Sequence, residues 1–69
     1  ERDRMKVGTL FKYRYPYGQR QLRYGVIVED LGEDILLVQW LDAAEPYKAT
    51  RSDMINLLKS GNEESGIII

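Results

Sequence analysis

Turn-forming residues divide this chain into short runs of apolar and β-branched residues. Two of these runs, 24–29 and 35–40, flank a turn that contains Gly32, a pattern that predicts a β-hairpin. A third run places Val7, Thr9 and Phe11 on one face of an extended segment. Short strands without a convincing helix of three turns favour an all-β fold.

The length of the chain limits the kind of β fold that it can form. With 69 residues, it makes one domain at most and buries only about 60% of the surface of its unfolded form. Because it has no cysteine, neither disulfides nor a zinc–thiolate site can stabilise it. Five strands are too few for an ordinary sandwich, whereas a small barrel closes one sheet around a single apolar layer. We therefore expect a five-stranded barrel.

The expected boundaries are a frayed N-terminus at 1–5, the barrel at 6–58 and a flexible tail at 59–69. Within the barrel, we expect a short strand at 47–50, a single helical turn at 52–54 and a last strand at 55–58. A longer helix over 51–59 is the alternative. The expected core consists of ten mostly aliphatic or aromatic side chains: Val7, Leu10, Phe11, Val26, Val28, Leu36, Val38, Trp40, Ile55 and Leu57.

Four segments together resemble the SH3-like small barrels, a group that includes the KOW and Tudor folds. They are Val-Gly-Thr-Leu at 7–10, Tyr-Gly-Val-Ile-Val at 24–28, the run ending in Trp40, and Ser-Asp-Met-Ile at 52–55. The resemblance covers about residues 6–58 and extends to small proteins of tailed bacteriophages. It implies a domain that binds peptides, modified side chains, nucleic acid or neighbouring subunits. The basic loop after the first strand lacks the acidic run of signalling SH3 domains, which argues against polyproline recognition.

The composition argues against catalysis. The chain has no histidine and no cysteine, which excludes Ser-His-Asp and Cys-His arrangements within it. The carboxylates around Asp30 and Asp34 flank a turn, where water is expected to solvate them, and their spacing does not match a calcium loop. We expect no enzyme activity, no cofactor, no metal and no small-molecule substrate.

Tyrosines and arginines alternate in the segment 13–24, which is the most distinctive part of the sequence. This mixture suits protein interfaces, where Tyr and Arg are enriched, and it also suits nucleic acids, where cations meet phosphates and aromatic rings stack on bases. Residues 1–24 carry a net charge of +5 and residues 25–69 a net charge of −6. A purely structural role, with tyrosines packed on the sheet and arginines paired with acids, is the third interpretation. The candidate residues are Tyr15, Tyr17, Arg20 and Arg23 for protein binding, and the same four with Arg14 for nucleic acid.

Two further features concern possible partners. The tail ends in three isoleucines, Ile67, Ile68 and Ile69, which either dock on another protein or fold back on the barrel's own edge. An aromatic cage for a methylated cation would need Trp40, Tyr47 and other aromatic residues (Tyr17, Tyr24) to converge beside an acid.

The preferred hypothesis is a non-catalytic protein-interaction or assembly module, such as a small phage structural or accessory protein, with another protein or copies of itself as partner. The alternative is a KOW-like nucleic-acid binder. No run approaches the roughly 18 apolar residues of a membrane span, and no signal peptide is visible. We therefore expect an intracellular or virion location and no membrane partner.

Overall fold

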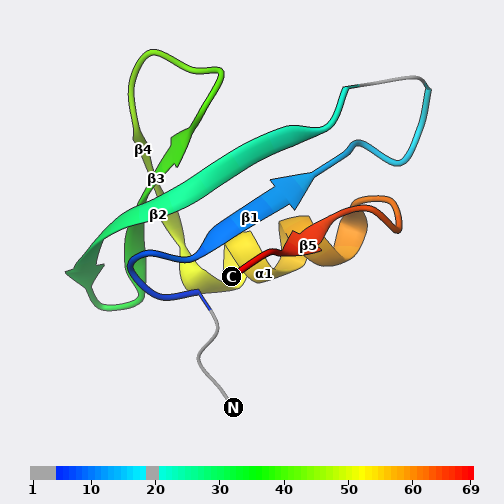
Figure 1. Ribbon diagram of the computed structural model, residues 1–69. Helices are drawn as coiled ribbons and strands as arrows, with labels where there is room; N and C mark the ends of the chain where they lie inside the picture. The colour runs from blue at the N-terminus through cyan, green and yellow to red at the C-terminus, as the bar shows by residue number, and fades with distance from the viewer. Residues whose placement is uncertain (1–4, 19–20) are drawn as a thin grey trace.

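The computed structural model describes residues 5–18 and 21–69, and in this part the chain forms five strands and one helix (Figure 1). All strand pairs are antiparallel, and the order in the sheet is β4-β3-β2-β1-β5. The prediction of an all-β fold is therefore confirmed in part, because the described residues form mainly antiparallel sheet with one helix; the closed five-stranded barrel is not confirmed. The sheet stays open, because β4 and β5 lie at its two ends. The elements are β1 (Leu10–Tyr13), β2 (Arg23–Gly32), β3 (Ile35–Trp40), β4 (Tyr47–Thr50), α1 (Arg51–Ser60) and β5 (Gly66–Ile67).

The core lies between the inner face of the sheet and α1. Four of its side chains were predicted, namely Phe11, Leu36, Val38 and Trp40. Of the face predicted for the first strand, Thr9 and Phe11 are buried as expected, whereas Val7 is exposed. Met5, Ile27 and Met54 complete the buried apolar cluster, and Ile55 and Leu57 pack against it from α1. Met5 thus belongs to the core and not to a frayed end; residues 1–4 lie outside the described residues.

The prediction of which β2 residues face the core is wrong by one position: Val26 and Val28 were expected there, and Ile27 takes that place. Ile27 is buried, whereas Val28 is 41% exposed, Val26 is only partly buried and Val7, in the turn before β1, is 54% exposed. A register shift between Ile27 and Glu29 leaves Val28 as an extra residue in the ladder, a β-bulge. Because every residue from Val26 to Val28 is aliphatic, the sequence pattern could not show which of them faces the core.

Gly25 explains why β2 takes this orientation. It pairs with Phe11 on one side and Trp40 on the other, and these two rings meet edge to face with centroids 5.2 Å apart. A Cβ atom at position 25 would lie 2.6 Å from Phe11 Cζ and 3.1 Å from Trp40 Cε3. The two aromatic rings therefore occupy the space that a side chain on Gly25 would fill.

The segment 51–60 is a ten-residue helix, so the predicted last strand at 55–58 is wrong and the alternative of a longer helix is confirmed. The Thr50 hydroxyl accepts a hydrogen bond of 3.0 Å from the backbone N–H of Asp53, which caps the helix start. Met54 and Leu58 then follow at helical spacing on the face towards the core. Among the described residues, no helix has both the length and the apolar character needed to cross a membrane.

Arg51 ties the start of α1 to the β2–β3 hairpin. Its guanidinium pairs with Asp34 at 2.6 Å and with Asp30 at 3.3 Å, and it donates to the backbone carbonyl of Met5 at 3.1 Å. The backbone N–H of Arg51 also donates to the Asp34 carbonyl. The Arg51 side chain thus joins the N-terminal segment, the hairpin turn and the helix. It can do so because a planar guanidinium presents several N–H donors in a fixed geometry.

We expect the substitution Arg51→Met to lower the free energy of unfolding by about 1–2 kcal/mol, since it removes charge-assisted hydrogen bonds that are only partly screened by water. Arg14→Met, which removes a more exposed arginine that makes a single pair with Glu64, should cost about 0–1 kcal/mol. Urea denaturation of both variants measures the difference. Equal costs would show that the Arg51 contacts contribute no more than an ordinary surface pair.

The C-terminal segment is part of the sheet, contrary to the prediction of a flexible tail from residue 59. After α1, the loop is held to the end of β1, where the Asn62 N–H donates to the Arg14 carbonyl at 2.9 Å and the Arg14 N–H donates to Ser65 Oγ at 2.8 Å. β5 then pairs with β1, and Figure 1 shows it below β1 in this view and beside α1. The fold-back alternative is therefore the arrangement that the structure adopts.

Candidate functional site

The predicted tyrosine- and arginine-rich segment forms a hollow of about 340 Å³ on the surface, next to the ends of β1 and β2. Two of its tyrosines meet edge to face at the rim: the ring centroids of Tyr15 and Tyr17 lie 5.6 Å apart, a favoured aromatic arrangement. Tyr15 is 46% exposed and Tyr17 is 72% exposed. We call this surface the aromatic hollow; its lining residues are Tyr13, Tyr15, Gln21 and Arg23.

Arg23 is fixed in the aromatic hollow by two partners. Its guanidinium carbon lies 4.2 Å above the centroid of the Trp40 ring, a cation–π distance. Its Nε and one terminal nitrogen each donate to a carboxylate oxygen of Asp42 at 2.9 Å. This hydrogen bonding lowers the pKa of Asp42, so the carboxylate is ionised at neutral pH. The pair is lost only as the pH falls through that lowered value.

Arg23 therefore forms one ordered wall of the aromatic hollow, and the arginines of the segment 13–24 that the structure describes are both paired with acids. The Arg23 cation is balanced by Asp42, and Arg14 is paired with Glu64 at 2.9 Å. The Tyr13 ring packs edge to face against Trp40 at 6.4 Å, which fixes the second side of the hollow. A protein side chain entering here would meet aromatic rings that are already ordered, which reduces the entropy cost of binding.

The structure brings only part of the predicted site together. Tyr15, Tyr17 and Arg23 lie in or beside the aromatic hollow, whereas Arg14 turns to the loop before β5. Arg20 lies outside the described residues. The isoleucines of the tail form a separate region, since Ile67 is in β5 and the next two residues hydrogen-bond to Leu10.

Tyr13 and Gln21 were not among the predicted binding residues, and their neighbours Trp40 and Asp42 were considered only for the aromatic cage. The prediction that Trp40 belongs to the core is confirmed, because the residue is only 7% exposed. Arg23 lies over its ring. The order of the chain gives no sign that Asp42, in the β3–β4 loop, meets Arg23 at the start of β2. That contact follows from the pairing of Gly25 with Trp40, which brings the two segments side by side.

The hypothetical aromatic cage does not form. Arg23 covers the Trp40 ring where a methylated cation would sit, and the hydroxyl of Tyr47 points to the sulfur of Met54 at 3.7 Å. Tyr17 instead packs against Tyr15. The carboxylates of the β2–β3 turn likewise bind Arg51, and the described residues contain no group of three or more side chains placed to hold a metal ion.

Comparison with protein-family models, with curated proteins and with solved structures gives no match to this chain.

Proposed function

We propose that this chain is a non-catalytic protein-interaction or assembly module that binds its partner, another protein or a copy of itself, at the aromatic hollow. The observation that carries the proposal is the exposed Tyr15–Tyr17 pair beside a guanidinium that is fixed by Trp40 and Asp42. Tyrosine and arginine in a preformed depression are the residue types that dominate binding energy at protein interfaces.

We also propose that the open sheet is a variant of the SH3-like barrel. Its strand order, with β1 between β2 and β5, and a helix that follows β4 support this assignment. In such a fold the loops and sheet ends are the binding surfaces, because the interior is filled by one layer of side chains. The aromatic hollow lies at such an end, between the loop after β1 and the start of β2. A structural or accessory role in a virion is one setting for a module of this kind.

Charge pairing favours a protein over a nucleic acid as the partner. A nucleic-acid site needs cations that are available to phosphates, and two of the predicted cations, Arg14 and Arg23, are instead bound to Glu64 and Asp42. The carboxylates of these pairs would lie close to any phosphate at the site and repel it. Tyrosine rings, by contrast, retain their exposed surface for contact with another protein.

The double substitution Tyr15→Ala/Tyr17→Ala should weaken partner binding by tenfold or more, a loss of about 1.4 kcal/mol or greater, as expected for aromatic side chains at the centre of an interface. The measurement is quantitative affinity capture with the wild-type chain and the variant as bait, followed by titration of the purified partner. Sedimentation of the same two chains alone tests self-association.

Tyr24→Ala provides the matched control, because Tyr24 is a tyrosine of similar exposure, 41%, that does not line the aromatic hollow. This variant should keep wild-type affinity. Wild-type affinity in the double variant would place the partner elsewhere, and an equal loss in both variants would show that the effect is not specific to the aromatic hollow. Salt-sensitive binding of a single-stranded oligonucleotide in about 50 mM salt, abolished by Arg14→Gln/Arg23→Gln, would overturn the proposal in favour of nucleic acid.

A further inference from the structure

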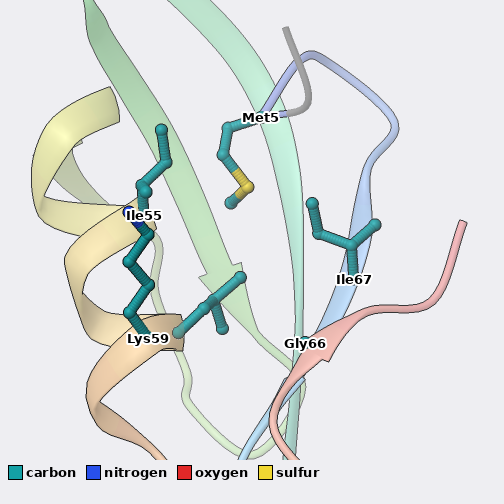
Figure 2. Close-up of a pocket in the computed structure, with 6 residues that line it drawn as sticks. Met5, Ile55, Lys59, Gly66 and Ile67 are labelled. Atoms are coloured by element: carbon teal, nitrogen blue, oxygen red, sulfur yellow. The ribbon is translucent and has the colours of Figure 1, made fainter. Parts of the chain in front are cut away.

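A second depression, of about 520 Å³, lies between α1 and β5, on the side where the sheet is open. Figure 2 shows Ile55 and Lys59 on the helix facing Ile67 across a gap, with the Met5 side chain at one end. Most of the lining is aliphatic, and its volume is in the range of ordinary ligand pockets. We call this depression the helix–strand groove; its lining residues are Met5, Ile55, Leu58, Lys59, Gly66 and Ile67.

One wall of the helix–strand groove is an unpaired strand edge. β5 is the last strand in the sheet order and pairs with β1 on one side only. On that side, the N–H of Ile68 donates to the carbonyl of Leu10 at 2.7 Å. Because successive residues of an antiparallel strand direct their main-chain groups to alternate sides, the N–H and C=O of Ile67 point away from β1. Because Gly66 and Ile67 both line the groove, this edge borders it.

A strand edge identifies the chemistry of the occupant better than apolar side chains alone. A lipid chain would fill the aliphatic lining but would leave the main-chain groups of Ile67 without partners. An extended peptide satisfies both requirements, since its backbone pairs with the edge and its alternate side chains enter the apolar space.

Lys59 adds a preference of charge. Among the described residues, it is the one charged side chain in the lining of the helix–strand groove, and it is exposed at the last turn of α1. A carboxylate on the incoming peptide, one or two residues from the aliphatic contacts, would pair with its ammonium group.

We propose that the helix–strand groove binds an extended segment of another protein, with alternating aliphatic residues and a flanking Asp or Glu, which adds to β5 as a further strand. This site shares no lining residue with the aromatic hollow. The proposal therefore holds or fails independently of the function proposed above.

The test is an NMR titration of the full ¹⁵N-labelled chain with the capped peptide Asp-Val-Thr-Val-Thr-Val-Asp, up to about 2 mM. We expect saturable shifts at the amides of Lys59, Gly66 and Ile67. The same peptide with its central valine N-methylated should bind about tenfold more weakly, because it loses a main-chain donor and cannot approach the edge. Shifts spread over the whole chain, or no shift at all, would overturn the proposal.

A charge exchange tests the role of Lys59 without altering the core. Lys59→Glu should lower the affinity for the acidic peptide by about two- to fivefold, the effect of one exposed ion pair. It should raise the affinity for a lysine-flanked version of the peptide by a similar factor. The matched control is Lys48→Glu, on β4 outside the groove, which should change neither affinity.

The same experiment tests two other possible occupants of the helix–strand groove, a lipid and a second copy of the chain. Decanoate, a carboxylate with an aliphatic tail, is titrated in parallel. If it saturates the groove and the peptide does not, the site binds a lipid and the proposal is wrong. If the groove amides shift with protein concentration and the peptide does not compete, a second copy of the chain is the occupant, and the proposal is again wrong.

Discussion

Replacing Gly25 by valine is expected to lower the free energy of unfolding by about 3 kcal/mol, a large part of the stability of a domain of this size. The reason is steric: the first atom of any side chain at this position would lie within 2.6–3.1 Å of Phe11 and Trp40. Both rings are held in the core, so neither can move away without opening a gap. Urea denaturation of the purified variant measures the loss.

A compensating substitution shows whether the clash is the cause. Gly25→Ala should destabilise the chain, and Phe11→Leu should do so by leaving a cavity. Because Phe11→Leu removes the ring atoms closest to position 25, the double variant should be more stable than the sum of the two losses predicts. A double-mutant cycle measures that coupling. Strict additivity would contradict the close approach of Gly25 to the Phe11 ring.

Deleting residues 66–69 is expected to abolish cooperative unfolding. The deletion removes β5, which pairs with β1, and the hydrogen bonds of the two following residues with Leu10. It also uncovers the edge of β1 beside the buried Phe11. A domain of this size has only a few kcal/mol of stability from its core, and loss of a strand from the sheet consumes most of it. Thermal and urea denaturation, followed by circular dichroism, measure the effect.

The matched control keeps the main chain of this segment. Ile69→Ser retains the backbone hydrogen bonds to Leu10 and changes a side chain that is 79% exposed, so its stability should stay within about 0.5 kcal/mol of wild type. An unchanged unfolding midpoint after the deletion would show that β5 contributes nothing to the fold. The expected result also means that loss of partner binding on deletion cannot by itself identify the tail as a docking segment.

The predictions from sequence were most accurate where residue type and spacing restrict the chain to one structure. The Gly-containing turn between two β-branched runs identified the β2–β3 hairpin, and large apolar residues such as Phe11 and Trp40 were correctly placed in the core. The helix was predicted only as the alternative, because Ile55, Leu57 and Leu58 suit a strand as well as a helix. Two signals that the prediction did not use indicate a helix: Thr50 as the capping residue and the four-residue spacing of Met54 and Leu58.

The aromatic hollow was predicted only in part for a related reason. The sequence places Tyr15 and Tyr17 two residues apart, so their proximity is a local property. Arg23 and Asp42 are nineteen residues apart, and nothing in their local sequence connects them. Whether an arginine is available to a ligand or already paired depends on which loops the sheet brings together.

The amino-acid sequence alone determined that this chain forms a small, mostly β domain without cysteine or histidine chemistry, because length, composition and short-range periodicity act within a few residues. The tertiary structure decided the inward face of β2, the fold-back of the isoleucine tail onto β1 and the charge balance of the aromatic hollow. Each of these depends on contacts between residues distant in the chain. The sterics of two aromatic rings against Gly25 and the pairing of strands select among arrangements that the local sequence allows equally.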